Sequence, residues 1–327
     1  MPTATAEVSR LAERSVEVIR AGQAETGAYL ACPVFPPYRY CWFRDGAFIA
    51  EAMSRAGEAD SAAAFFRWGA DVVLARRLSI EAGGDLETRY TIDGQESHVE
   101  EWLSFQLDGF GLFLWALARH EERHGRADGH VAEAAELLSA YLARSWRREC
   151  TDWWEERDGL HATTLACIGA GLRAAGDLES ARIVEALRTE ADWRLDASLV
   201  AVATPLCVLG PEAVPLAEIE RELVSPGGGV HRHPADTYYG GGEWLLLTAL
   251  LGWHYLELGR TDDARAKLDW VAAHATPAGE LPEQSQDHLL APDHYEPWVA
   301  RWGPPPSPLL WSHAMFLLLA HALEEAP

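Results

Sequence analysis

The fold is decided by a pair of segments, Glu243-Trp-Leu-Leu-Leu-Thr-Ala-Leu-Leu-Gly-Trp-His-Tyr-Leu256 and Thr261-Asp-Asp-Ala-Arg-Ala-Lys-Leu-Asp-Trp-Val-Ala-Ala-His-Ala275. The first segment is apolar on every side, whereas the second alternates apolar and charged residues at helical spacing. A helix that is apolar all round must be buried on all sides, and an amphipathic helix can cover it. A glycine-rich and aromatic loop, residues 227–242, precedes the pair. The local unit is therefore a loop, a buried helix and a covering helix.

The same unit recurs along the chain, and the sequence predicts six copies of it. The apolar helices are expected at Asp45–Met53, Phe110–Arg119, His161–Ala174, Ala197–Leu209, Glu243–Leu256 and Leu309–Leu323. The amphipathic helices are expected at Asp60–Arg77, Gly129–Trp146, Leu178–Glu190, Val214–Leu223, Thr261–Ala275 and Val8–Ala21, the last paired with the final apolar helix. No stretch shows sustained strand alternation, which favours an all-α fold over α/β. We expect residues 1–327 to form a single (α/α)6 toroid, six inner apolar helices wrapped by six outer amphipathic ones; the alternative is an open α-solenoid.

Each polar aromatic loop precedes an inner helix, so all six loops are expected at the same end of the ring. They carry Tyr38, Trp42, Arg44, Asp45, Trp102, Gln106, Asp108, Trp154, Glu155, Glu156, Arg232, Asp236, Tyr238, Trp244, Glu283 and Gln284. Aromatic rings cover the apolar faces of a sugar, while carboxylates and arginines bind its hydroxyls or move protons. The convergence of these side chains predicts a carbohydrate pocket.

Two carboxylates on opposite loops indicate the chemistry. Glu155 lies in the third loop, within Asp152-Trp-Trp-Glu-Glu-Arg-Asp-Gly159, and Glu283 lies in the sixth. Glycoside hydrolysis needs one protonated carboxyl group to help the leaving oxygen depart and one ionised group to activate water. A separation of roughly 6.5–9.5 Å between them would make the enzyme inverting. The alternative is that Glu155 and its neighbour Glu156 are only two acids at the start of a helix, where their negative charge interacts favourably with the helix dipole.

Six motifs in order resemble those of glycoside hydrolase family 15, the glucoamylase and glucodextranase family, over almost the whole chain. They are Tyr38-Arg-Tyr-Cys-Trp-Phe-Arg-Asp, Trp102 with Gln106-Leu-Asp-Gly, Trp154-Glu-Glu, Arg232-His-Pro-Ala-Asp-Thr-Tyr-Tyr-Gly, Pro282-Glu-Gln and Leu310-Trp-Ser-His-Ala. The resemblance implies that Glu155 is the general acid and Glu283 the general base. We expect the pKa of Glu155 to be raised, because desolvation beside the tryptophans and the like charge of Glu156 both disfavour its ionisation, and we expect Glu283 to stay ionised. The resemblance also implies contacts to the sugar from Tyr38, Trp42, Arg44, Asp45, Trp102, Gln106, Asp108, Trp154, Glu156, Arg232, Tyr238, Gln284 and Trp311.

Composition excludes several other classes of function. The formal charge is −23, from 27 basic and 50 acidic residues, which argues against binding to nucleic acid or to an anionic membrane. No apolar run reaches the length of a membrane span, and the N-terminus lacks the pattern of a signal peptide, so a cytoplasmic location is expected. The five cysteines show no Cys-x-x-Cys spacing, and His161, His231, His233 and His313 form no metal-binding motif. We expect neither a metal nor another cofactor.

The expected activity is that of an inverting, exo-acting α-glucosidase that releases β-glucose from small α-glucosides of the isomaltose or maltose type. Bacterial relatives commonly carry a β-sandwich before the toroid and fungal ones a starch-binding domain after it. This sequence shows neither, and its toroid is short, which favours a small saccharide over starch. A trehalase of the same family, a sugar epimerase that uses histidines, and a non-catalytic sugar-binding protein are the alternatives. The linkage, the leaving group and the oligomeric state stay open.

Overall fold

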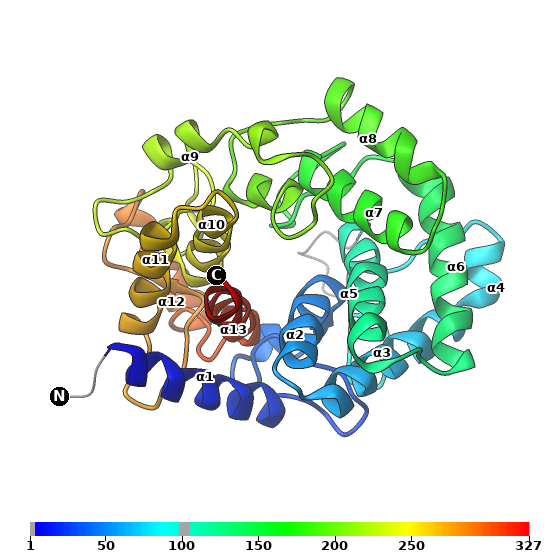
Figure 1. Ribbon diagram of the computed structural model, residues 1–327, viewed down its shortest axis with the longest axis horizontal. Coiled ribbons are helices and arrows are strands. Elements are labelled where there is room, and N and C mark those ends of the chain that lie inside the picture. Colours follow the sequence, from blue (N-terminus) through cyan, green and yellow to red (C-terminus); the bar gives the residue numbers. More distant parts are fainter. Residues whose placement is uncertain (1–3, 98–104, 327) are drawn as a thin grey trace.

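A computed structural model describes residues 4–97 and 105–326, and its helices form a closed double ring (Figure 1). The inner ring consists of α2 (Phe43–Arg55), α5 (Asp108–His124), α7 (Ala162–Ala174), the 3-10 helix η2 (Ala197–Val202), α10 (Leu245–Glu257) and α13 (Leu310–Glu325). Each of these segments packs on the next one, and α13 packs back on α2. The inner helices are buried as expected: every residue of α10 from Leu245 to Tyr255 is buried. The predicted all-α toroid is confirmed.

The outer ring consists of the amphipathic helices α1 (Ala4–Ala21), α3 (Ala59–Leu74), α6 (Gly129–Ser145), α8 (Glu179–Thr189), α9 (Leu216–Glu222) and α11 (Thr261–Ala273). The first of them, α1, packs on α13, the last inner helix. The rings also carry two short helices that the sequence pattern did not predict, α4 (Arg77–Glu81) and α12 (Tyr295–Trp302). No helix among residues 4–97 and 105–326 is long and apolar enough to cross a membrane.

The fourth inner position differs from the prediction. A full helix was expected over Ala197–Leu209, but regular structure ends at Val202 and is of the 3-10 type. Pro205 explains the early end, because proline lacks the N–H of a helical hydrogen bond and disfavours helical geometry in the preceding residue, Thr204. The β-branched residues Val200 and Val202 add to this effect. The segment is nevertheless buried, so the ring closes without a sixth α-helix.

Three antiparallel pairs of two-residue strands tie the loops together at one end of the ring. The pairs are β1 (Cys41–Trp42) with β2 (Arg89–Tyr90), β3 (Cys150–Thr151) with β4 (Asp158–Gly159), and β5 (Glu243–Trp244) with β6 (Gln284–Ser285). The strands are too short for the alternating pattern that reveals a strand in a sequence. They fix the loops that precede α2, α7 and α10, which are the loops expected to carry the site.

Candidate active site

The loops enclose a cavity of about 290 Å³ at this end of the ring. Twelve of the predicted site residues line it: Tyr38, Trp42, Arg44, Asp45, Trp154, Glu155, Glu156, Arg232, Tyr238, Trp244, Glu283 and Trp311. Four others, Gln106, Asp108, Asp236 and Gln284, lie behind the cavity wall, where they hold lining residues or backbone in place. The remaining one, Trp102, lies outside the described residues. The volume lies just below the roughly 300–1,000 Å³ of pockets for drug-sized ligands, and it suits one or two sugar rings.

Glu155 occupies the turn between β3 and β4 in a strained conformation. Its φ of 60° is left-handed, which costs a residue with a Cβ some free energy and is typical of functional sites. Trp42 Nε1 donates to its Oε1 at 2.6 Å, and Arg89 Nη1 donates to its Oε2 at 2.9 Å. Burial raises the pKa of Glu155; the cations Arg44 and Arg89 and the Trp42 bond oppose this, and Asp108 adds to it. A carboxyl group with a raised pKa is suited to donate a proton.

Arg89 is a site residue that the sequence analysis missed. It is 1% exposed, and Trp42 is its partner in the β1–β2 register. Because both residues contact the carboxylate of Glu155, this strand pair positions two of the groups that hold the acid. The surrounding residues, Thr88-Arg-Tyr-Thr-Ile92, carry no polar aromatic cluster. Only the pairing with β1, which is remote in sequence, brings Arg89 to the site.

Glu283 lies deep in the cavity and is 2% exposed. Tyr38 Oη donates to its Oε1 at 3.0 Å, and the Tyr38 and Tyr238 hydroxyls lie 2.8 Å apart. The other oxygen, Oε2, has no hydrogen-bond partner among the described residues. We expected Glu283 to stay ionised, but burial raises its pKa to about 8, against the lowering effects of Tyr38 and Arg232. The shift is opposite to the expectation, because desolvation of the buried carboxylate outweighs the hydrogen bond from Tyr38.

Arg44 and Asp45 form the charged floor of the cavity at the start of α2. Arg44 Nη1 donates to Gln106 Oε1 at 2.9 Å and to Asp108 Oδ2 at 3.1 Å, while its Nε lies 3.6 Å from Asp45 Oδ1. The guanidinium also lies 5.5 Å from the ring centre of Trp311. Burial raises the pKa of Asp45 to about 7, with the cation of Arg44 opposing. Polar groups held in this way by neighbours are preorganised to bind sugar hydroxyls.

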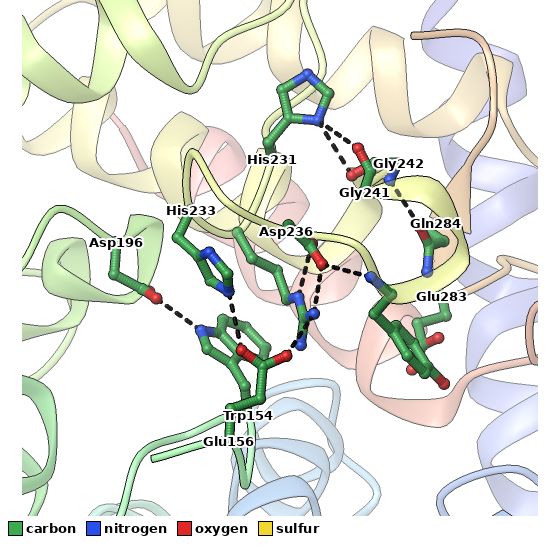
Figure 2. A network of polar contacts seen from close by, with 12 residues as sticks. Trp154, Glu156, Asp196, His231, His233, Asp236, Gly241, Gly242, Glu283 and Gln284 are labelled. Atoms are coloured by element: carbon green, nitrogen blue, oxygen red, sulfur yellow. Dashed lines mark hydrogen bonds and ion pairs between the residues drawn. The ribbon is translucent and has the colours of Figure 1, made fainter. Parts of the chain in front are cut away.

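Glu156 belongs to a polar network around Arg232 and His233 (Figure 2), and its partners differ from those of Glu155. Arg232 Nη2 contacts Glu156 Oε1 at 2.8 Å, and His233 Nε2 contacts Glu156 Oε2 at 3.0 Å. Asp236 accepts from Arg232 at 2.8 and 2.5 Å. Although burial opposes the change, His233 and Arg232 hold the pKa of Glu156 low, at about 2. Glu156 was expected to raise the pKa of its neighbour as a like charge; that role falls to Asp108 instead.

The same network is the one cluster among the described residues whose geometry could hold a metal ion. It comprises Glu156, His233 and Asp236, whose ligand atoms lie within 4.8 Å of one another. Arg232 donates to both carboxylates, so a cation already balances their charge. Its guanidinium is fixed over Trp154, Tyr238 and Trp244 at 5.1–5.2 Å. These residues fit an arginine-centred ion-pair network better than a metal site.

Aromatic residues that the resemblance did not assign complete the cavity wall. They are Phe35, Trp153, Trp244, Trp298 and Trp302. Trp244 is held by the β5–β6 pair and lies 5.2 Å from the ring of Trp154. Trp298 and Trp302 come from α12, within a segment that we expected to be loop. Their position one helical turn apart was a signal in the sequence, since such residues share a helix face.

A toroid whose pocket holds the carboxyl groups of Glu155 and Glu283 beside the Arg44–Asp45 pair is typical of a glycoside hydrolase. The family described as "Glycosyl hydrolases family 15" matches residues 15–195. The chain is 38% identical to the isomaltose glucohydrolase of Kribbella flavida, with 98% of this chain and 94% of that protein covered. The chain belongs to glycoside hydrolase family 15.

Two solved structures are similar to this one. The first is a glycosidase with one glutamate replaced by alanine, in complex with glucose; it shares 37% identity over 98% of both chains, with a TM-score of 0.91. The second is the glucoamylase of Saccharomycopsis fibuligera, with 14% identity, 99% of this chain and 96% of that chain covered, and a TM-score of 0.77. At that identity the second likeness concerns the fold alone.

Proposed function

We propose that the protein is an inverting, exo-acting α-glucosidase that releases β-glucose from isomaltose or a similarly small α-glucoside. The observation that carries the proposal is the placement of Glu155 and Glu283 in one cavity whose floor is the Arg44–Asp45 pair. The identity to an isomaltose glucohydrolase over nearly the full chain supports the choice of substrate. We further propose that residues 1–327 act as a single catalytic domain, in the cytoplasm.

In this mechanism Glu155 protonates the glycosidic oxygen while water attacks C1 from the opposite side. Glu283 takes a proton from that water, and the paired hydroxyls of Tyr38 and Tyr238 orient the water and the base. The C1–O bond to the leaving group breaks, so one water molecule is consumed and the anomeric configuration inverts. Arg44, Asp45 and Trp311 hold the sugar ring that is released as glucose.

The test is proton NMR of freshly formed product from isomaltose, maltose and trehalose at equal concentrations. We expect β-glucose as the first product and the highest kcat/KM on isomaltose. An α-anomer formed first would exclude inversion. If trehalose is the only one of the three sugars to be hydrolysed, the protein is a trehalase and the proposed substrate is wrong. Binding of these sugars without hydrolysis would leave a sugar-binding protein.

A further inference from the structure

The cavity is charged at its deep end, and its more exposed lining includes both polar and aromatic side chains. At the deep end Glu283, Arg44 and Asp45 are 2%, 6% and 7% exposed. At the mouth the Glu156 side chain is 37% exposed, and the indoles of α12 are half-buried. An exo-acting enzyme with its glucose unit at the deep end must direct the leaving group toward the mouth. The mouth therefore determines which leaving groups are accepted.

The polar part of the lining is the network around Glu156 and Arg232 (Figure 2). The apolar part includes Phe35, Pro37, Trp298 and Trp302, which we call the apolar wall. The two tryptophans lie four residues apart on α12, so they share one helix face. The wall continues into the catalytic tyrosine pair, because Phe35 lies 5.2 Å from Tyr38 and Trp298 lies 4.9 Å from Tyr238.

The tryptophans of the apolar wall do not serve the core of the ring. No residue of α12 is buried, and its main packing partners are two 3-10 turns, η4 (Tyr238–Gly240) and η5 (Pro292–His294). Half-exposed indoles on a cavity wall leave apolar surface in contact with water, which is unfavourable unless a ligand covers it. The position and chemistry of these residues thus fit an apolar ligand group at the mouth.

We propose that the apolar wall binds the leaving group and that the enzyme hydrolyses alkyl and aryl α-glucosides as well as disaccharides. This inference rests on the proposed α-glucosidase function. The reaction balances in the same way: water adds to C1, the C1–O bond breaks, and Glu155 supplies the proton that converts the leaving group to an alcohol. Glu283 receives the proton lost by water. Only the surface in contact with the leaving group differs from disaccharide hydrolysis.

The experiment compares kcat/KM on methyl, butyl and hexyl α-glucoside. These substrates present nearly the same leaving oxygen and differ in apolar surface, so the comparison isolates binding by the wall. Complete burial of each added methylene would raise kcat/KM by about fourfold. Since the wall covers one side of the chain, we expect about twofold per methylene, or roughly 30-fold from methyl to hexyl. Equal kcat/KM on the methyl and hexyl compounds would overturn the inference.

The Trp302→Ala variant should reduce the hexyl-to-methyl ratio of kcat/KM by about fivefold or more. Trp302→Leu, which retains apolar surface, should restore part of that ratio. The matched control is Glu296→Ala, an exposed residue of α12 outside the cavity lining, which should keep the wild-type ratio. A ratio that stays at the wild-type value in Trp302→Ala would also overturn the inference, provided that its melting curve shows a folded protein.

The same measurements separate this inference from the proposed function. If the wild-type protein hydrolyses isomaltose but does not favour the hexyl compound, the wall does not bind leaving groups and the α-glucosidase proposal stands. If it hydrolyses no α-glucoside, the proposed function fails. In that case the hydrolysis of alkyl and aryl α-glucosides fails with it, and calorimetric binding of hexyl and methyl α-glucoside to the Glu155→Gln protein decides only whether the wall binds apolar groups. Tighter binding of the hexyl compound would support binding by the wall, and equal binding would refute it.

Discussion

Replacing Tyr38 with Phe tests how the base is kept reactive despite its burial. The change removes one hydroxyl and keeps the ring that packs against Phe35 and Trp42. In the native structure this hydroxyl donates to Glu283 Oε1 at 3.0 Å, a bond that favours the ionised carboxylate and lowers its pKa. Without the bond, the pKa of Glu283 should rise further above about 8.

The magnitude follows from the worth of a hydrogen bond to a charged group. Such a bond contributes about 1.5–3 kcal/mol, and one pKa unit corresponds to about 1.36 kcal/mol. The pKa of Glu283 should therefore rise by roughly one to two units. The reactive form has Glu155 protonated and Glu283 ionised. Each unit by which the pKa of Glu283 rises makes this form about tenfold scarcer, so kcat/KM should fall by roughly 10- to 100-fold.

The assay is kcat/KM on isomaltose between pH 4 and pH 10. The two carboxyl groups titrate as a pair, so the wild-type profile should be bell-shaped. The acidic limb, set by Glu155, should lie above the usual glutamate range, and the basic limb, set by Glu283, should lie near pH 8. In Tyr38→Phe the basic limb should move upward. Tyr238→Phe should shift it in the same direction but less, because that hydroxyl contacts Tyr38.

Tyr141→Phe is the matched control, since it removes a buried hydroxyl of α6 that contacts the backbone N–H of Leu86 outside the cavity lining. It should leave the pH profile unchanged. The reasoning is refuted if Tyr38→Phe lowers kcat/KM without moving the basic limb, or moves that limb to lower pH. Either result would mean that the hydroxyl does not act through the ionisation of Glu283.

Three further variants test the roles of the carboxyl groups. Glu155→Gln should lower kcat on isomaltose by about 100-fold or more, and less on 4-nitrophenyl α-glucoside, whose leaving group needs no proton; equal losses on both substrates would exclude Glu155 as the acid. Arg89→Gln removes a cation that lowers the pKa of Glu155, so the acidic limb of kcat/KM should move to higher pH, and an unmoved limb would contradict this role. Glu283→Gln should stabilise the fold at alkaline pH. With a pKa of about 8 in the folded state, Glu283 binds more protons in the folded protein than in the unfolded one. Its carboxyl group therefore lowers the free energy of unfolding as the pH rises: by nothing below about pH 4.5, and by at most roughly 5 kcal/mol above pH 8. The melting temperature should exceed that of wild type clearly at pH 8.5 and little at pH 5; the reverse order would argue against a raised pKa.

The sequence predicted the ring well because the inner helices differ in composition from the outer ones. A segment such as Leu245–Glu257, apolar on all faces, has no stable place outside the interior of an all-α fold. The prediction failed where one local residue outweighs the pattern: Pro205 ends the fourth inner segment although its composition is that of the others. The prediction of the ring therefore rested on the periodicity of apolar residues. The fourth inner segment departs from it because proline restricts the backbone.

The candidate site could be predicted only where a motif carries its residues in one stretch. Glu155, with its tryptophan neighbours, is visible in this way, whereas Arg89 reaches the same carboxylate only through the β1–β2 pairing. The ionisation of Glu283 was mispredicted because desolvation depends on the whole fold and not on adjacent residues. The wall residues Trp298 and Trp302 were missed because α12 lies in a proline-rich segment that was interpreted as loop.

The contact between α1 and α13 has a consequence for the order in which the protein is made. Helix α1 leaves the ribosome before the other helices of the ring, but its partner, residues 310–325, is synthesised after all of them. Until then, the apolar sides of α2 and α10 that face α13 have no partner either, and such surfaces promote aggregation of nascent chains. Ribosome-bound chains that stop before residue 310 should therefore be sensitive to protease and recruit chaperones. Chains that include α13 should form the pocket and become resistant to protease at the same stage.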